Sequence, residues 1–282
     1  YDGAEICDVS ASQKQFVSMG AWLLVWPDKI AYNTADGTVK QLEAEYTSAA
    51  DVTFTLCSID GTPYENYYTG GEAPDSTKYT YWLDTSSAPH VLRVYSTATN
   101  LWNSVPTTYV RIGCAGLGTE FAAYDAVEIS GCKDEQFNTT MIVWEQGDDY
   151  IVVTGIIDEA FTQTTEQGAV AVARRAPDME FLTEHENRVW GCNSEKNEIY
   201  ACKLGDPTNW YCYQGIASDS YAATVGTDGP FTGAATHLGY VLFFKENCIH
   251  KVFGTKPSNY QITKVDCRGV QKGLSLIHIS EP

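Results

Sequence analysis

The stretch Val17–Thr34, VSMGAWLLVWPDKIAYNT, contains the pattern that decides the fold. An apolar run rich in aromatic and β-branched residues is joined to a second such run through a short polar tip. Two later stretches repeat the pattern: ENRVWGCNSEKNEIYAC at Glu186–Cys202 and LGYVLFFKENCIHKVFG at Leu238–Gly254. Each is typical of an antiparallel hairpin. A hairpin unit that recurs along a chain predicts a repeat architecture, and we expect an all-β protein that forms a partial β-propeller.

The composition favours the same fold class. The chain has 282 residues, which allows one large or two medium domains. Aromatic residues make up 12% of it and charged residues only 19%, and no long stretch has sustained helical periodicity. No uncharged apolar run reaches the length that a bilayer-spanning helix needs, so we expect no membrane insertion.

The charge of the chain restricts its partners. The formal net charge is −18 and the sequence pI is about 4.5. Such a surface repels phosphate, so we expect no sequence-specific binding of DNA or RNA. The charge is also uneven, because eleven acidic residues and one lysine lie between Gly113 and Ala173.

These patterns divide the chain into four expected segments. Residues 1–112 form the first propeller blades, residues 113–173 form a small acidic β-domain inserted between blades, and residues 174–273 form the later blades. The insert has strand-like runs at Ala126–Ser130 and Tyr150–Ile157 but lacks the hairpin pattern. Residues 274–282 are expected to be foreign to the fold.

Those last nine residues, LSLIHISEP, resemble the translated read-through of a sequencing adapter. A segment of this origin is not expected to contribute to the fold. The chain also starts at Tyr1 rather than at a methionine, so we expect its start to be processed or missing. Both features predict a metagenomic fragment of a longer protein that holds further blades.

Two similar sequence stretches, STATNLW at 96–102 and LGDPTNW at 204–210, each end in a tryptophan that closely follows an asparagine. The first phrase follows two expected strands, Tyr79–Asp84 and Val91–Tyr95. We expect the two phrases to form equivalent turns, each of which places an aromatic side chain on the neighbouring unit.

The nine cysteines are odd in number, irregularly spaced and without a CxxC motif. This pattern predicts reduced, mostly buried thiols in a protein assembled in a reducing cytosol. A disulfide between Cys192 and Cys202, on the two arms of one hairpin, is a less favoured alternative. A zinc site is the least favoured, because no close Cys or His pair has the usual ligand spacing.

The sequence gives little indication of an enzyme, because known catalytic motifs are incomplete or missing. His185 lies in a His-Glu pair without the second histidine of HExxH, and neither GxSxG nor a P-loop occurs. The phrase SIDGT at 58–62 only partly resembles the tip repeat of sialidase propellers. A propeller glycoside hydrolase remains a minor alternative, since carboxylates are abundant. Its candidate acids, by abundance alone, are Asp28, Asp84, Asp125, Asp148 and Asp149. We expect no catalytic residues.

We also expect no cofactor and no metal ion. The pair Asp148-Asp149 is the one sequence feature that suggests calcium, but a lone acidic pair is usually a solvated turn. The glycine-rich stretch Gly226–Gly233 precedes a strand, whereas a phosphate-binding loop requires a following helix N-terminus.

Exposed aromatic residues raise a different possibility, a host-recognition module that binds cell-surface glycans. Its candidate binding residues are Tyr64, Tyr67, Tyr68 and Trp102. Tyrosines near acids can stack on sugars and hydrogen-bond to them. The simpler interpretation, which we favour, is that these tyrosines fill and cover β-sheets.

Several stretches resemble structural proteins from tailed phages of gut bacteria. These are NRVWGCNSEKNEIYACKLGDPTNW (Asn187–Trp210), DSY (Asp219–Tyr221), GTDGPFTG (Gly226–Gly233), VLFFKENCIHK (Val241–Lys251) and, near the start, SMGAWLLVWPDK (Ser18–Lys29). The resemblance covers most of residues 15–273 and is strongest from Asn187 to Gly254. The expected arrangement is similar in logic to that of tail nozzle proteins, in which a propeller carries inserted β-domains. It implies a virion role, a β-propeller core and no cofactor.

The expected function is therefore that of a non-enzymatic virion structural protein in the tail or head–tail connector region. It is expected to assemble in the cytoplasm of the bacterial host, with copies of itself as a homo-oligomer and with other virion proteins as partners. The acidic insert is expected to contact another subunit or to line a passage along which DNA slides.

Overall fold

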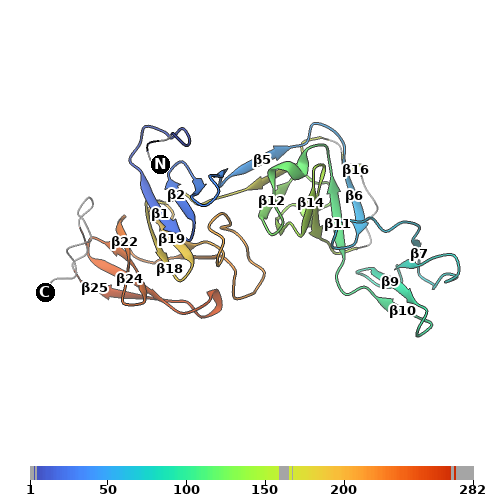
Figure 1. Cartoon of the computed structure of the whole chain (residues 1–282). Helices are drawn as coiled ribbons and strands as arrows, with labels where there is room; N and C mark the ends of the chain where they lie inside the picture. The colour runs from blue at the N-terminus through green and yellow to red at the C-terminus, as the bar shows by residue number, and fades with distance from the viewer. Residues whose placement is uncertain (1–2, 4, 159–164, 167, 268–269, 271–282) are drawn as a thin grey trace. The chain divides into compact units, whose positions relative to one another are not determined.

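The chain folds into β-sheets joined by turns, and its described part forms two compact units (Figure 1). The computed structural model describes residue 3, residues 5–158, 165–166 and 168–267, and residue 270. Unit 1 contains residues 1–43 and 175–282, and unit 2 contains residues 44–174. The helical elements among the described residues are three 3₁₀ turns, η1 (Leu117–Glu120), η2 (Glu135–Phe137) and η3 (Pro257–Asn259). No helix in this part is long and apolar enough to span a membrane. The all-β prediction is confirmed.

Unit 1 contains three four-stranded antiparallel sheets in which neighbouring strands follow chain order. The first consists of β1 (Gln15–Met19), β2 (Trp22–Trp26), β3 (Ile30–Asn33) and β4 (Val39–Gln41). The second consists of β18 (Phe181–His185), β19 (Arg188–Asn193), β20 (Glu198–Ala201) and β21 (Tyr221–Thr224). The third consists of β22 (Phe231–His237), β23 (Tyr240–Lys245), β24 (Cys248–Phe253) and β25 (Gln261–Asp266).

The recurring hairpin of the sequence forms the two central strands of each of these sheets. The pairs β2–β3, β19–β20 and β23–β24 are all antiparallel, as predicted. In the second and third sheets a two-residue turn also joins the first strand to this hairpin. Both residues of each turn have positive φ, 49° and 57° at Glu186 and Asn187 and 48° and 78° at Leu238 and Gly239. Such turns match the twist of paired strands.

The three sheets follow one another through their first strands. Strand β18 lies beside both β1 and β22. Apolar side chains fill the space between the first and second sheets, and they include Leu24, Trp26, Val189 and Tyr200. A second cluster between the second and third sheets includes Trp190, Phe231 and Phe243. The repeated sheets thus share two buried aromatic cores.

The two tryptophan phrases differ in structure. Trp210 follows the second sheet's hairpin and packs on the first sheet, with its ring 5.5 Å from that of Trp26. The expectation is confirmed there. Trp102 instead contacts Trp82 and Tyr95 of its own sheet, so the expectation for it is wrong. The reason is that Trp102 lies within a strand, β10 (Leu101–Ser104), and not in a turn that leaves the sheet.

Unit 2 contains three further sheets. One has the order β14 (Glu145–Gly147), β15 (Tyr150–Thr154), β11 (Tyr109–Gly113), β6 (Val52–Cys57) and β16 (Thr165–Glu166). The second has the order β13 (Thr140–Ile142), β12 (Ala126–Ser130), β17 (Ala171–Arg174) and β5 (Ala44–Thr47). The third has the order β10, β9 (Val91–Ser96), β8 (Tyr81–Asp84) and β7 (Tyr68–Gly70). All three contribute side chains to one core, which includes Phe54, Val110, Val127 and Leu92.

Unit 2 begins much earlier than the expected insert of residues 113–173. Its first residue is Ala44, and its last, Arg174, lies one residue beyond the expected end. Strand β5 pairs with β17, and β6 pairs with β11. Residues 44–112, which we expected to form blades, therefore share sheets and a core with the acidic segment. Leu274–Pro282 lies outside the described residues.

Candidate functional site

The small sheet β7–β10 brings aromatic and charged side chains together on one face. Side chains of paired residues lie on the same face of a sheet, and alternate residues of a strand share that face. Tyr68 pairs with Trp82, Trp82 with Arg93, and Tyr95 with Trp102. We call this surface the Trp102 face, and it consists of Tyr68, Trp82, Asp84, Arg93, Tyr95, Trp102 and Ser104.

The aromatic rings of the Trp102 face support one another. The Trp102 ring lies 5.8 Å from that of Trp82 at 79°, and 5.2 Å from that of Tyr95 at 59°. Trp82 is buried, whereas Tyr95 and Trp102 are half-buried. Trp82 Nε1 donates a hydrogen bond to Gly70 O at 2.7 Å. The buried indole is thus fixed, and it holds a second indole whose surface is partly open.

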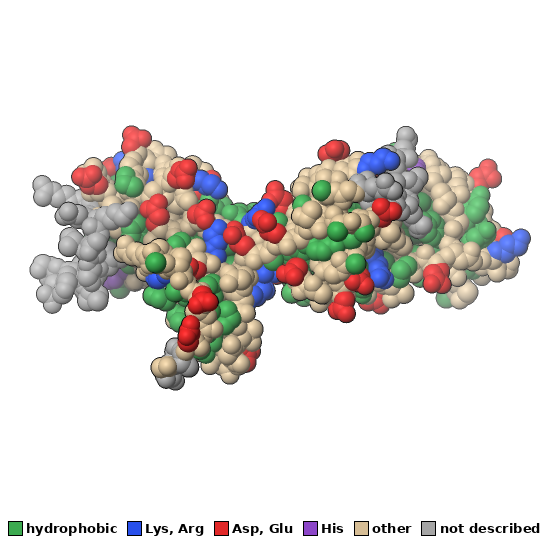
Figure 2. Space-filling view, turned by 90° about the horizontal axis from the view of Figure 1, so that it is seen from above, with side chains coloured by type: hydrophobic (Ala, Val, Ile, Leu, Met, Phe, Trp, Pro, Cys, Tyr) green, Lys and Arg blue, Asp and Glu red, His purple; other side chains and the backbone are tan. Residues whose placement is uncertain are grey.

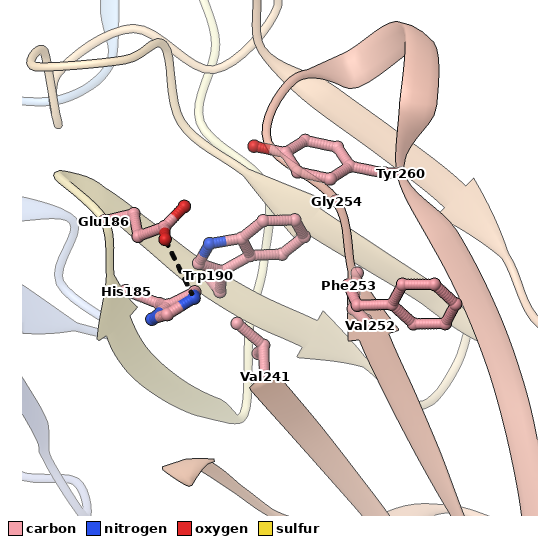
Figure 3. Close-up of a pocket in the computed structure, with 8 residues that line it drawn as sticks. All are labelled: His185, Glu186, Trp190, Val241, Val252, Phe253, Gly254 and Tyr260. Carbon is pink, nitrogen blue, oxygen red and sulfur yellow. Dashed lines mark ion pairs between the residues drawn. The ribbon is translucent and has the colours of Figure 1, made fainter. Parts of the chain in front are cut away.

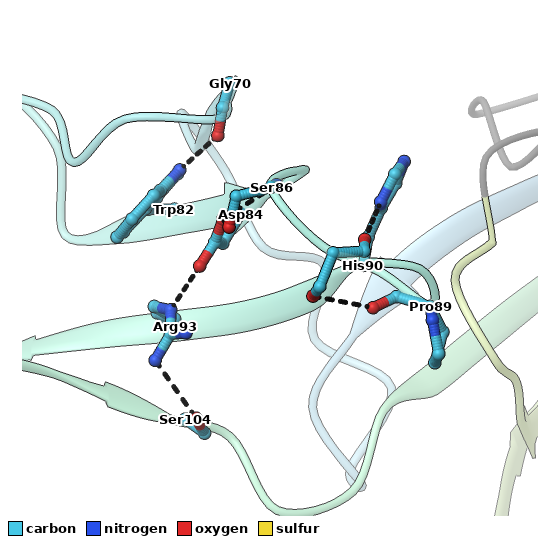
Figure 4. A network of polar contacts seen from close by, with 9 residues as sticks. Gly70, Trp82, Asp84, Ser86, Pro89, His90, Arg93 and Ser104 are labelled. Carbon is cyan, nitrogen blue, oxygen red and sulfur yellow. Dashed lines mark hydrogen bonds and ion pairs between the residues drawn. The ribbon is translucent and has the colours of Figure 1, made fainter.

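A polar chain crosses the same face (Figure 4). Arg93 Nε donates to Asp84 Oδ2 at 2.8 Å, and Arg93 Nη1 donates to Ser104 Oγ at 3.2 Å. The guanidinium also lies over the Trp82 ring, 5.5 Å from its centroid. Burial acts to raise the pKa of Asp84, but hydrogen bonds from Ser86 and Arg93 outweigh it and leave that pKa below its ordinary value. Asp84 is therefore a carboxylate at neutral pH and fixes the guanidinium.

The four aromatic residues predicted as a glycan site fall into two groups. Tyr68 and Trp102 lie on the Trp102 face. Tyr64 and Tyr67 pack against the core of unit 2, and burial raises the pKa of both phenols. The Tyr64 ring lies 4.6 Å from that of Tyr81. Tyr64 and Tyr67 therefore have a packing role, as expected from the interpretation that these tyrosines fill and cover β-sheets.

Four of the five candidate acids accept hydrogen bonds from nearby protein groups, and the fifth, Asp148, is exposed. Asp28 binds Lys14 and the Ser10 amide, which hold its pKa at about 2. Asp125 accepts from Arg174 at 2.6 Å, and Asp149 Oδ1 accepts from the Gly116 amide at 2.7 Å. These carboxylates, like Asp84, fix loops and strands. In the part of the chain that the structure describes, no group of three or more His, Cys, Asp or Glu side chains is arranged to hold a metal ion.

All nine cysteines have free thiols, including Cys192 and Cys202. Burial raises the pKa of the Cys57 and Cys202 thiols to about 12 and that of Cys192 well above its ordinary value. These three thiols are therefore protonated at neutral pH and poor nucleophiles. The predicted reduced state of the chain agrees with this arrangement.

A small cavity in unit 1 lies between β19, β23 and β24 (Figure 3). His185, Glu186, Trp190, Gly254 and Tyr260 are among its lining residues, and its free volume is about 10 Å³. That volume is close to the least that holds one water molecule. Trp190 Nε1 is buried there without a hydrogen-bond partner among the described residues. The cavity is too small for an organic ligand.

Two buried indoles of unit 1, those of Trp26 and Trp190, give a matched test of these contacts. Trp26 Nε1 donates to Pro177 O at 3.0 Å, whereas Trp190 Nε1 has no protein partner in the described part. Trp26→Phe and Trp190→Phe remove similar side-chain volumes. Only Trp26→Phe leaves a buried carbonyl, that of Pro177, without its hydrogen-bond donor. We expect Trp26→Phe to lower the free energy of unfolding by about 1–2 kcal/mol more than Trp190→Phe. Urea unfolding measures both values, and equal losses would contradict the hydrogen-bond assignment.

His250 on β24 predicts a pH dependence of stability. The ring is buried, its Nε2 lies 2.7 Å from Thr227 Oγ1, and burial, with smaller effects from Lys245 and Lys264, lowers its pKa below 6.5. The unfolded chain therefore binds this proton more readily than the folded one. Stability is expected to fall as pH drops through about 6.5 toward the folded pKa. His250→Gln is expected to flatten the profile between pH 7 and 5, as urea midpoints will measure. An unchanged slope would argue against His250 as the cause.

The charge differs between the two units. Residues 44–174 contain 18 acidic and 5 basic side chains, a net charge of −13 out of the −18 of the whole chain. Acidic side chains are scattered over the visible surface rather than gathered in one patch (Figure 2). Unit 2 therefore presents a broad negative surface.

Comparison with known protein families finds no match to the chain, and comparison with curated proteins finds none either.

Proposed function

We propose that the chain is a non-enzymatic structural component of a tailed-phage virion, in the tail or head–tail region and similar in logic to tail nozzle proteins. The observation that supports this most is the succession of three four-stranded sheets in unit 1, joined through β1, β18 and β22. Sheets of four strands that follow one another around an axis are the blades of a β-propeller. We interpret these three sheets as consecutive blades.

Packing between the sheets suits a mechanical role. Trp26 and Trp210 meet between the first and second sheets, and Trp190 and Phe243 are buried between the second and third. Large buried aromatic contacts make each sheet depend on its neighbour for stability. A stiff platform of this kind transmits force between subunits without a chemical step.

Unit 2 is inserted in the chain between the first and second sheets, and it supplies the surface for assembly. Its net charge of −13 repels DNA phosphates, so a passage lined by it lets DNA slide without sticking. The same surface also suits contact with a basic patch on another virion protein. Identical copies arranged with rotational symmetry repeat each such contact.

Two other functions have less support. Glycoside hydrolysis needs a pair of carboxyl groups free to act on a sugar, whereas Asp28, Asp84, Asp125 and Asp149 hold structural hydrogen bonds. Host recognition through all four predicted aromatics needs Tyr64 and Tyr67 exposed, but both pack against the core.

Protein identification in purified particles tests the proposal. Particles released by a culture that carries the gene are separated on a density gradient, and the proteins of each fraction are identified by mass spectrometry. We expect peptides of both units in the fraction of intact particles, at the level of a multi-copy structural protein. A host ribosomal protein serves as the contamination control. Peptides found only with the cell debris would overturn the proposal.

A further inference from the structure

We propose that the Trp102 face binds a neutral, hexose-based glycan, with the Trp102 ring as the stacking surface and Arg93 as a hydrogen-bond donor to sugar hydroxyls. This site goes beyond a structural role and does not depend on the blade assignment. A pyranose ring has an apolar C–H face and a polar rim. Its binding site therefore combines an open aromatic face with nearby polar groups.

The stacking surface is rigid before any ligand arrives. Trp102 lies on β10, the edge strand of its sheet, and no other described strand pairs with its outer side. Trp82 and Tyr95 contact the Trp102 ring, and Trp82 is itself fixed to Gly70 O. A side chain that is already held in place loses little entropy on binding. Its partly open surface is what distinguishes Trp102 from the buried Trp82.

Unused donors lie next to that ring. Arg93 uses Nε for Asp84 and Nη1 for Ser104, and its Nη2 has no hydrogen-bond partner among the described residues. The Arg93 side chain is 28% exposed. Asn100 Oδ1 lies 3.3 Å from the Tyr95 hydroxyl, so the exposed Asn100 amide nitrogen is available as a second donor. Asn100 precedes Trp102 in the chain, and Ser104, which pairs with Arg93, follows it. Donors that flank an aromatic residue in this way match the hydroxyl rim of a sugar.

Charge selects the class of ligand. Aromatic platforms also stack nucleic-acid bases, and a lone arginine also attracts acidic sugars. Arg93 is already neutralised by Asp84, and unit 2 carries a net charge of −13. A polyanion therefore meets repulsion over the whole unit. A neutral polysaccharide meets none.

The test measures binding of the full chain to immobilised glycans. Neutral probes are dextran, laminarin, mannan and galactan, and anionic probes are heparin, polysialic acid and oligo-dT. We expect saturable binding to at least one neutral probe and none to the anionic ones. Trp102→Ala is expected to weaken that binding ~10-fold or more, as is usual for an aromatic anchor. Trp102→Phe, which keeps a ring, is expected to retain part of the affinity.

Leu101→Ala is the matched control, because Leu101 neighbours Trp102 in β10, points to the opposite face and is 61% exposed. Thermal unfolding of each variant shows that it is folded. Arg93→Gln, which keeps an amide donor but lacks the guanidinium, is expected to weaken binding at unchanged stoichiometry. Failure to bind any neutral probe, binding only to anionic probes, or equal binding by Trp102→Ala and Leu101→Ala would each overturn the proposal.

Discussion

The Arg188→Met variant is expected to have a free energy of unfolding about 3–5 kcal/mol lower than that of the unmodified chain. Arg188 is only 1% exposed. Its Nη1 donates to Cys202 O at 2.6 Å and to Asp219 O at 2.5 Å, and its Nη2 donates to Ala217 O at 2.9 Å. Methionine fills similar space but leaves three carbonyl groups without their donor, each at a cost of about 1–3 kcal/mol. Removal of the buried charge offsets part of that loss.

The effect is expected to reach beyond the substituted strand. The three carbonyls belong to the long connection from β20 to β21, which also carries Trp210. Loss of Arg188 frees this connection and weakens the packing of Trp210 on Trp26. Urea unfolding followed by tryptophan fluorescence measures the change.

Arg188→Lys is expected to lose less stability than Arg188→Met, since an ammonium group still reaches some of the carbonyls. Glu195→Gln, at an exposed position in the turn between β19 and β20, is the control and should change stability by less than about 0.5 kcal/mol. A similarly small change for Arg188→Met would contradict this account.

The second large effect is expected in unit 2, where Asp125→Ala should also lower the free energy of unfolding by about 3–5 kcal/mol. Asp125 and Arg174 are both buried, and Arg174 Nη1 donates to Asp125 Oδ2 at 2.6 Å. The same carboxylate oxygen accepts from the Ala122 amide at 2.9 Å. Alanine removes the carboxylate from a buried guanidinium and also leaves the Ala122 amide without this acceptor.

A double-mutant cycle separates the ion pair from these other contacts. Once Asp125 is alanine, Arg174→Met no longer breaks the ion pair with Asp125, so the double variant should be less destabilised than the two single losses added together. Asp125→Asn keeps an acceptor for the Ala122 amide and is expected to lie between Asp125→Ala and the unmodified chain. Additive losses would show that the two side chains do not stabilise each other.

Local features of the fold followed from the sequence. The three hairpins appeared in it as apolar runs around a polar tip, and each forms the centre of a four-stranded sheet. The start of unit 2 did not follow, because it depends on pairing between distant segments. The β5–β17 pairing places Ala44 in the same sheet as Arg174, and no local pattern in residues 44–112 indicates that partner.

The candidate site was predictable only in part. Aromatic content pointed to Tyr68 and Trp102. The alternation in YTYWLD and VLRVY would have added Trp82, Arg93 and Tyr95, since alternate residues of a strand share a face. The register that places Arg93 opposite Trp82 is a tertiary property. Tyr64 and Tyr67 lie in the connection between β6 and β7, where no periodicity reveals that they pack against the core.

A cryo-electron microscopy reconstruction of particles that contain the protein tests the central proposal most directly. The account predicts density for this chain in the tail or head–tail region, repeated by rotational symmetry. It also predicts the sheets that begin with β1, β18 and β22 as consecutive blades around one axis. A reconstruction in which the chain is absent from that region, or in which these three sheets share no axis, would contradict it.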